Sequence, residues 1–511
     1  MKDPDLSANK QTMSTENYGS TEMKQRIDSM VNDWRKMLYE SFLGKAEPIK
    51  LDVVEGAACD LREKFGRDIV QEIIQAQVDE TESQEQEDGV TKCACQGCKR
   101  QIPFRGVQKR TVVTMAGDVC VKRRAHYCKR CKMCTMPTDI QLGLPPRTFT
   151  RSVELSVGRL CVKDTFESAM DDLSGMARVS VSPKEAQRIT IALGQQAQKA
   201  MAKDMAMAMP KNPRSPHLRL HKPEKLAPQL DDPTLIAYIS MDGVMVPIRG
   251  LRINEKGKQE RYVVWTEAKL GRVDLVQKPT KDGEDSKTIS SHFTYTLDGP
   301  DVCGKQTYAI AARAGVTKLR WVVVISDGAE WIRKRFKEHF PYAIHILDWY
   351  HAVEHLANVL RVCLTAALAK SSPDGKVDET KLKEWCKKLA GVGKTLMIEG
   401  KTKQLIKFIK KLPQVTADAV ESVRQTTGYY LKNISRMKYN EYIDKGLRIG
   451  SGAMESGCKQ VADFRMKRSG MCWSVEGATA MGALRCEFLS TGRWETLFGE
   501  YCGRPRHAAS V

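Results

Sequence analysis

The spacing of apolar residues changes along the chain and predicts different kinds of structure in turn. Between residues 27 and about 78 the apolar residues recur at helical spacing, for example at Val70, Ile73 and Ile74. This period indicates an amphipathic helical region. We expect the acidic run 79–89 that follows to be a linker, and residues 1–26, which are polar, to be disordered.

A strand-like pattern begins at Leu235 and ends before Asp348. β-branched and aromatic residues cluster here in short runs bounded by polar residues. The predicted strands are 235–240, 249–253, 262–269, 321–326 and 343–347. Beyond Asp348 the helical period returns for about a hundred residues. The predicted helices are 351–369, 379–389, 404–411 and 416–431, and the glycine-rich stretch 391–395 is expected to be a loop between two of them.

Acidic residues stand at three marked positions of this pattern. Asp242 and Asp327 each follow an apolar run and precede a glycine, and Glu455 lies in the first turn of a helix expected after Ser451. A single strand-terminal Asp-Gly pair is more often a turn. Three carboxylates placed on two strands and a helix start are what two divalent cations about 4 Å apart require for phosphoryl transfer. The pattern therefore predicts a metal-dependent site.

Charge and length narrow the class of protein. A chain of 511 residues is long enough for three or four domains, and its net charge of +20 favours a polyanionic partner, with nucleic acid the first choice. A merely well-solvated basic surface is the alternative. No run of about 18 apolar residues exists and the N-terminus lacks the apolar core of a signal peptide. We therefore expect a soluble, cytoplasmic protein without a membrane partner.

Six of the sixteen cysteines lie in one short segment, and two Cys-x-x-Cys pairs flank a predicted strand-turn-strand. Two thiolate pairs joined by a hairpin are the arrangement of a zinc ribbon, and reduced surface cysteines are the alternative. The predicted structural Zn²⁺ ligands are Cys95, Cys98, Cys128 and Cys131, with Cys93 and Cys134 as alternatives.

Basic residues surround the cysteine module, and a helical segment follows it. Arg123 and Arg124 lie on the second predicted strand, where phosphate contact is expected. Residues 148–209 are expected to be helical, with a capped helix beginning at Pro183. A helix-turn-helix DNA reader and ordinary helical packing both fit this pattern. The proline-rich stretch 210–233 is expected to be a linker.

Five motifs also carry a resemblance to a known family. In chain order they are Ser-Met-Asp242-Gly, Ile-Ser-Asp327-Gly-Ala, Asp348-Trp-Tyr-His351, Ile-Gly-Ser-Gly-Ala-Met-Glu455-Ser and Arg465-Met-Lys-Arg-Ser-Gly-Met-Cys-Trp473-Ser. Over about residues 93–490 the chain resembles the ISKra-type bacterial insertion-sequence transposases of the ribonuclease-H-like DDE superfamily. The resemblance implies a retroviral-integrase-like fold, Asp242, Asp327 and Glu455 as the catalytic triad, and Mg²⁺- or Mn²⁺-dependent cleavage and strand transfer at element ends.

Further residues near these motifs are candidates for auxiliary roles. Asp348 and His351 match an Asp-x-x-His motif of Mutator-like relatives, although a helix cap beside a buried histidine would look the same. The candidate DNA contacts are Lys459, Arg465, Lys467, Arg468 and Trp473. A solvated helix face and a core tryptophan are the alternatives for this set.

Together these observations predict an α/β multidomain protein with a ribonuclease-H-like mixed sheet and a long all-helical insertion. The expected divisions are 1–26 disordered, 27–90 helical with an acidic linker, 91–147 a zinc-ribbon-like module, 148–209 helical, 210–233 a linker, 234–348 and 449–492 the two parts of the core, 349–448 the insertion, and 493–511 a tail. The expected function is a DNA transposase with two Mg²⁺ or Mn²⁺ and a structural Zn²⁺, acting as a nucleoid-associated homo-oligomer on terminal inverted repeats and target DNA. A nuclease of the same fold without joining activity and a domesticated DNA-binding protein are the alternatives.

Overall fold

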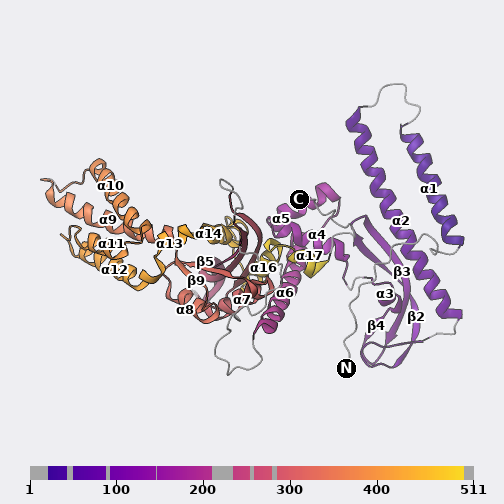
Figure 1. Cartoon of the computed structure of the whole chain (residues 1–511). Helices are drawn as coiled ribbons and strands as arrows, with labels where there is room; N and C mark the ends of the chain where they lie inside the picture. Colours follow the sequence, from indigo (N-terminus) through magenta and orange to yellow (C-terminus); the bar gives the residue numbers. More distant parts are fainter. Residues whose placement is uncertain are drawn as a thin grey trace. The chain divides into compact units, whose positions relative to one another are not determined.

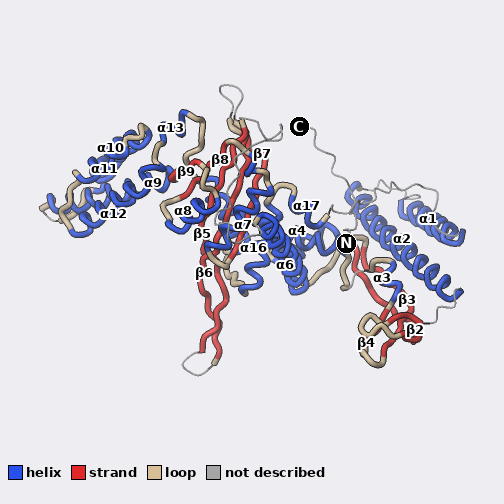
Figure 2. Tube along the Cα trace, turned by 60° about the horizontal axis from the view of Figure 1, so that its bottom comes forward, coloured by secondary structure: helices blue, strands red, loops and turns tan. Residues whose placement is uncertain are grey.

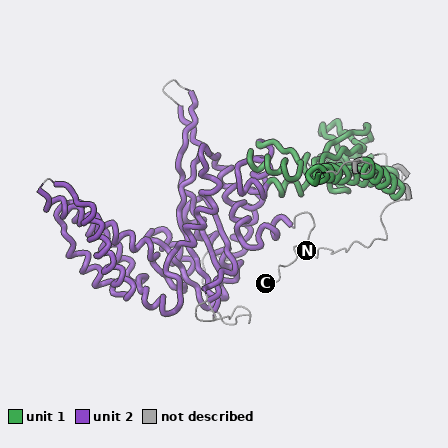
Figure 3. Tube along the Cα trace, turned by 90° about the horizontal axis from the view of Figure 1, so that it is seen from above, with its two compact units in different colours: residues 1–157, 167–183 green, residues 158–166, 184–511 purple. Residues whose placement is uncertain are grey.

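The computed structural model describes residues 21–42, 50–87, 92–144, 147–209, 234–253, 258–278, 285–373 and 375–499. The chain forms two compact units (Figure 3). Unit 1 comprises residues 1–157 and 167–183, and unit 2 comprises residues 158–166 and 184–511. The predicted linker 210–233 and residues 1–20 lie outside the described part of the chain.

Unit 1 combines two long helices with a small sheet (Figure 1). The sheet has the antiparallel order β1-β2-β3-β4. Trp34 and Phe65 join the two long helices, with ring centroids 4.4 Å apart. The elements are α1 (Thr21–Phe42), α2 (Leu51–Glu87), β1 (Lys92–Ala94), β2 (Gln101–Thr114), β3 (Gly117–Cys128), β4 (Met133–Thr135), α3 (Pro137–Gln141), α4 (Arg151–Cys161) and α5 (Phe166–Ala177).

The predicted acidic linker is wrong, because most of its residues extend helix α2 to Glu87. The helix is held in place along strand β3. Val78 packs against two β3 valines, and the side chain of Gln75 both accepts from the Lys122 N–H at 2.9 Å and donates to the Lys122 carbonyl at 3.0 Å. The Glu82 carboxylate accepts from the Arg124 N–H at 2.6 Å. Side chains of α2 thus bond to backbone N–H and carbonyl groups along an edge of β3 that would otherwise be open.

Unit 2 is built on a mixed five-stranded sheet in the order β7-β6-β5-β8-β9 (Figure 2). Strands β5, β6 and β7 are antiparallel, and β8 and β9 run parallel to β5. The strands are β5 (Leu235–Ile253), β6 (Gln259–Gln277), β7 (Lys287–Thr296), β8 (Trp321–Ser326) and β9 (Ile344–Leu347).

Two features of this sheet differ from the prediction. Strand β7 was not predicted, because serine, threonine and histidine interrupt its apolar residues. Strand β5 is one continuous strand of 19 residues rather than two, so Asp242 lies within a strand and not at its end. Gly243 continues the strand, paired with Lys269 of β6. The position requires a glycine, because a Cβ there would stand 1.9 Å from the Glu267 carboxylate.

Helices cover both faces of the sheet. On one face Ala237, Ile239 and Met241 pack against α7 (Pro300–Arg313) and α8 (Glu330–His339). On the other face Ile236 and Tyr238 share a core with the helical insertion. The alternation of strand side chains places Asp242 on this second face.

The insertion is helical as predicted. Its elements are α9 (Trp349–Ser371), α10 (Glu379–Ile398), α11 (Thr402–Lys410), α12 (Ala417–Asn433), η2 (Ile434–Arg436) and α13 (Tyr439–Asp444). The predicted loop 391–395 is wrong: it lies inside α10, where Gly393 allows α9 to approach, since a Cβ there would stand 2.5 Å from Leu356. Among the described helices, α9 alone is long and apolar enough to cross a membrane, but Leu356 and Leu360 place it in the protein core.

The last elements complete unit 2. They are α14 (Gly452–Cys458), the π-helix η3 (Lys459–Asp463), α15 (Phe464–Met466), α16 (Val475–Leu489) and α17 (Arg493–Phe498), with α6 (Pro183–Ala208) and η1 (Val316–Lys318) preceding them. Helix α6 begins at Pro183 as predicted, but it packs into unit 2: Gly194 lies so close to α16 that a Cβ would stand 2.3 Å from the Ala480 carbonyl. The range 148–209 is therefore divided between the units, and the predicted tail begins with a helix that buries Trp494.

Candidate functional site

Three aspartates fall in one row across the parallel strands. Strands β5 and β8 pair with a constant offset of 85 residues, from Ile236 with Trp321 onward. Strands β8 and β9 pair with a constant offset of 21 residues, ending at Ser326 with Leu347. The same offsets, extrapolated three residues beyond the last β5–β8 pair and one residue beyond the last β8–β9 pair, align Asp242 with Asp327 and Asp327 with Asp348. The Asp348 N–H donates to the Ser326 carbonyl at 2.8 Å, which continues the pairing by one residue.

Asp242 is half-buried and lies among other acidic and sulfur groups. Its Oδ1 accepts from the Gly243 N–H at 2.7 Å, and the Cys458 Sγ lies 4.0 Å from its Oδ2. Burial raises the pKa of Asp242, the Gly243 hydrogen bond lowers it, and the negative charges of Asp327 and Glu267 raise it further, so the pKa lies above its ordinary value. The negative charge of this group is therefore costly unless a cation compensates for it.

Asp327 follows β8 directly and is fixed by a tight local turn. Its Oδ1 accepts from the Ala329 N–H at 2.9 Å. The next residue, Gly328, lies under the ring of Tyr429 from the insertion, and a Cβ there would stand 2.1 Å from the Tyr429 Cε2. The Tyr429 ring also stacks on His355, with centroids 3.9 Å apart. The insertion thus forms one wall beside Asp327.

Asp348 connects the row to the helix that carries Glu455. Its side chain is fully buried and caps α9, where it accepts from His351 Nδ1 at 2.5 Å and from the His351 N–H at 3.2 Å. Its other oxygen accepts from the Ser451 N–H at 2.7 Å, at the start of α14. Burial raises the pKa of Asp348, but the hydrogen bonds from His351 and Ser451 outweigh it, and the pKa lies below its ordinary value.

His351 is a cation that faces the acidic row. Its hydrogen bond to Asp348 raises the pKa, burial opposes this, and the charges of Asp327 and Asp242 raise it further, to about 9. The imidazole is therefore protonated at neutral pH. The predicted auxiliary pair of Asp348 and His351 is in contact, and it lies between the acids and the start of α14.

Glu455 is exposed on α14, which packs against β5 through Cys458. The α14 backbone is also held by Arg272 of β6, which donates to the Ala453 carbonyl. Among the described residues, one group of three or more potential metal ligands has all its ligand atoms within 4.8 Å of one another. It consists of Cys95, Cys98, Cys128 and Cys131 in unit 1. The carboxylates of Asp242, Asp327 and Glu455 are not such a group.

The structure gives two of the predicted DNA contacts internal roles. Arg465 is fully buried, donates to the Cys161 carbonyl at 2.6 Å, and lies over the rings of Phe166 and Trp473. Trp473 is buried, and its Nε1 donates to the Met466 carbonyl at 3.0 Å. Neither side chain can reach a phosphate in this conformation, because both are enclosed by the fold. They join α15 to Cys161 and Phe166.

The other basic residues of this stretch remain accessible. Lys459 is exposed at the start of the π-helix. Lys467 is partly exposed and pairs with Asp463 at 2.7 Å. Arg468 is 38% exposed and bonds to Asp164 and to the Phe464 carbonyl at 2.8 Å.

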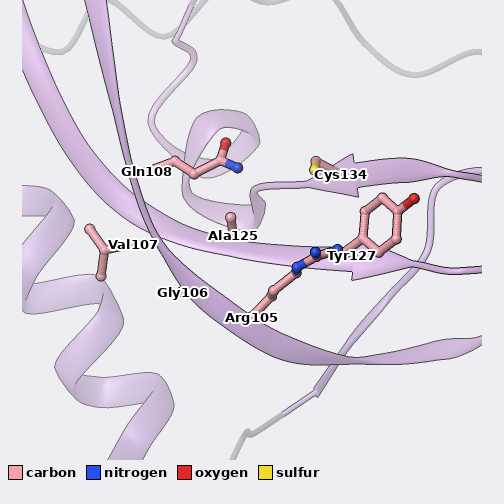
Figure 4. A pocket seen from close by; sticks show the side chains of 7 residues that line it. All are labelled: Arg105, Gly106, Val107, Gln108, Ala125, Tyr127 and Cys134. Carbon is pink, nitrogen blue, oxygen red and sulfur yellow. The ribbon is translucent and has the colours of Figure 1, made fainter.

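The basic residues predicted on β3 also differ from one another. Arg123 is buried and forms an ion pair with Asp139 at 2.5 Å, so its expected phosphate contact is replaced by an internal one. Arg124 lies over the ring of Phe104, 4.5 Å from its centroid. A hollow on the same sheet contains Arg105, whose guanidinium lies over the Tyr127 ring at 4.5 Å (Figure 4). The hollow is lined by Arg105, Gly106, Val107, Gln108, Ala125, Tyr127 and Cys134.

Four cysteines of unit 1 come together as one group. The sulfur atoms of Cys95, Cys98, Cys128 and Cys131 all lie within 4.8 Å of one another, and this arrangement could hold a metal ion. N–H groups of Cys98 and Gly97 lower the pKa of the Cys95 thiol to about 7, whereas the Cys98 sulfur and burial raise the pKa of the Cys131 thiol to about 12, as expected of thiols that share one site without a cation. These are the four preferred ligands from the sequence. Cys93 and Cys134, the alternatives, are not in the group.

Sequence reasoning missed three residues beside the acidic row: Glu267, Tyr429 and Cys458. Glu267 packs over Gly243 and Tyr429 packs over Gly328, and no local sequence pattern indicates either contact. Cys458 lies one helical turn after Glu455, and that spacing could have placed it on the same face of α14.

Comparison of the sequence with family models and with curated proteins finds no match. Among solved structures, the chain has a low similarity to the Drosophila P element transposase strand transfer complex. The TM-score is 0.22 and the identity 11%, over 69% of this chain and 82% of that chain. A TM-score this low does not establish a common fold, so the functional interpretation rests on the chain's own residues.

Proposed function

We propose that this protein is a DNA transposase of the ribonuclease-H-like DDE type, in which Asp242, Asp327 and Glu455 hold two Mg²⁺ or Mn²⁺ ions. The observation that supports this most is the alignment of Asp242 with Asp327 on neighbouring parallel strands, with α14 packed on the same face. Carboxylate oxygens are the ligands that these cations prefer. The raised pKa of Asp242 is consistent with a site that requires positive charge.

The proposed reaction is an in-line attack of water or a DNA 3′-hydroxyl on a phosphodiester. The bound cations would supply charge stabilisation for the entering and leaving oxygens. Asp348 fixes the start of α14 and thereby the direction of Glu455. The protonated His351 reduces the repulsion between Asp327 and Asp242. Lys459, Lys467 and Arg468 are the accessible cations that would contact phosphates of the bound strand.

The ISKra-type assignment remains part of this proposal and rests on the five sequence motifs. Helices α9 to α13 lie in sequence between the last strand of the mixed sheet and α14, and this order supports a catalytic core of residues 234–348 and 449–492 with an insertion of residues 349–448. We further propose that unit 1 holds a structural Zn²⁺ in its four-cysteine group and binds element ends, and that the protein acts as a homo-oligomer on double-stranded DNA.

A strand-transfer assay tests this function. The DNA that flanks the coding sequence supplies candidate element ends, prepared as duplexes with a free 3′-hydroxyl and incubated with a supercoiled target plasmid in Mg²⁺. The proposal predicts joined products with the wild-type chain and none with Asp327→Asn. Cleavage without joining under Mg²⁺ and Mn²⁺ would indicate a nuclease of the same fold, and neither cleavage nor joining would contradict the proposal.

A further inference from the structure

Strands β5 and β6 continue beyond the rest of the sheet as a two-stranded arm, visible as a projection in Figures 2 and 3. The arm comprises residues 245–253 and 259–267, which pair from Met245 with Glu267 to Ile253 with Gln259. Strand β8 pairs with β5 no further than Ile239. The backbone of Trp473 bonds to β5 at Pro247 and Arg249. The part beyond Gly250 therefore has no third strand among the described residues.

The two faces of the arm have different character. Directly paired residues of an antiparallel ribbon share a face. One face carries five large apolar side chains that are 43% to 73% exposed: Met245, Leu251, Ile253, Val263 and Trp265. The opposite face carries one exposed large apolar side chain, Tyr262, which is 41% exposed. Near the sheet this face buries Val246 and Ile248, and further out Arg252 pairs with Glu260 and lies over the ring of Tyr262.

Five exposed large apolar side chains on one face of the arm need an explanation. An isolated two-stranded ribbon is only marginally stable in water, and a contiguous exposed apolar face marks an interaction site. Arg249 and Arg261 lie on the same face as the apolar side chains, because Arg249 pairs with Val263 and Arg261 pairs with Leu251. Apolar side chains interspersed with arginines favour a partner that offers both negative charge and apolar surface.

We propose that this face of the arm seats in a groove of double-stranded DNA. A two-stranded ribbon fits the major groove, and apolar side chains beside arginines also insert between base steps in the minor groove. The inference rests on the proposed function, because the arm extends the strand that carries Asp242. By strand alternation this face of the arm continues the side of β5 that carries Met241, opposite to the side that carries Asp242. A second copy docked through this face would bring like-charged arginines together, so DNA is the partner that the charges fit.

Site-specific crosslinking of the full chain tests the contact directly. Leu251→p-benzoylphenylalanine places a photoreactive group on the exposed apolar face, and Glu260→p-benzoylphenylalanine places it nearby on the opposite face. Both are irradiated with a fluorescein-labelled duplex of mixed sequence in buffer without Mg²⁺ or Mn²⁺, so the readout does not depend on catalysis. We expect a DNA adduct from position 251 and little from position 260.

The salt dependence of binding supplies a matched test. Arg261→Ala and Arg252→Ala remove the same charge from neighbouring positions on opposite faces of the arm. Fluorescence anisotropy with the same duplex at several salt concentrations should show a log–log slope reduced by about one for Arg261→Ala and unchanged for Arg252→Ala. The variant Leu251→Ser with Ile253→Ser should weaken binding at least about fivefold.

The outcomes separate this inference from the proposed function. If the wild-type chain binds and cleaves DNA but position 251 gives no DNA adduct and the two arginine variants behave alike, the arm inference fails and the transposase proposal stands. A protein–protein adduct from position 251, with a concentration-dependent dimer in sedimentation, would assign the face to a second copy and overturn the inference. If the wild-type chain does not bind DNA, both fail.

Discussion

Replacing Asp348 with alanine should loosen the start of α14 and displace Glu455. The Asp348 carboxylate is fully buried and accepts hydrogen bonds from the Ser451 N–H at 2.7 Å and the His351 N–H at 3.2 Å. Alanine leaves both donors without this acceptor, at roughly 1–3 kcal/mol each. The local cost is therefore about 2–6 kcal/mol, which includes the range of about 3–5 kcal/mol for removing one partner of a buried ion pair.

Asp348→Asn is the matched control for this prediction. An asparagine keeps the shape and a carbonyl oxygen that can accept from the Ser451 N–H, but it loses the charge that pairs with His351. We expect a smaller cost of about 1–2 kcal/mol. The order of local stability should therefore be wild type, then Asn, then Ala.

Hydrogen exchange followed by mass spectrometry measures the local stability of the start of α14 in the full chain. A cost of about 3 kcal/mol speeds exchange through local opening by roughly a hundredfold. Peptides that cover residues 447–455 should exchange faster by about this factor in the alanine variant, whereas the exchange rates of peptides from α2 in unit 1 should not change. Unchanged exchange in 447–455, or equal effects of Asn and Ala, would refute the role assigned to Asp348.

Three further predictions concern other parts of the molecule. Cys128→Ser should abolish stoichiometric zinc in the purified chain, measured by plasma mass spectrometry, whereas Cys134→Ser, outside the four-cysteine group, should retain it; equal zinc contents would refute the assigned ligands. Gly328→Ala should lower stability by about 1–3 kcal/mol, because its methyl group meets the Tyr429 ring, and Tyr429→Ala in the same chain should relieve most of this cost in a double-mutant cycle. The pKa of His351 is raised from 6.5 to about 9, so its ion pair with Asp348 contributes fully to stability below pH 6.5 and this contribution is lost as the pH rises through about 9. The hydrogen-exchange protection of residues 447–455, corrected for intrinsic exchange, should therefore fall over this interval in the wild type. It should stay flat in His351→Gln.

Much of unit 2 follows from local patterns. The run that ends at Asp327 is a short buried strand of β-branched residues, and the structure confirms it as β8 next to β5. The helices of the insertion follow from their apolar period. The spacing of 85 residues between Asp242 and Asp327 equals the offset between the paired strands, and this equality could be recognised only after the pairing was known.

The errors arise where distant residues decide the structure. Asp242 was expected at a strand end because a following glycine favours a turn, yet Glu267 from the neighbouring strand lies over Gly243 and the strand continues. Arg465 was expected on the surface because it is charged, yet the Cys161 carbonyl and two aromatic rings make burial acceptable. Glu267, Cys161 and Phe166 are distant in sequence, and no local pattern could have revealed their contacts.

Metal rescue of Asp327→Cys tests the central claim most directly. A thiolate is a poor ligand for Mg²⁺ and accepts softer cations, so cleavage of a labelled duplex carrying an element end should be lost in Mg²⁺ and partly restored in Mn²⁺ or Cd²⁺. The control Asp301→Cys, on the opposite side of the sheet in α7 and 73% exposed, should cleave normally in Mg²⁺. Full activity of Asp327→Cys in Mg²⁺ would contradict the assignment of Asp327 as a metal ligand, and with it the proposed triad.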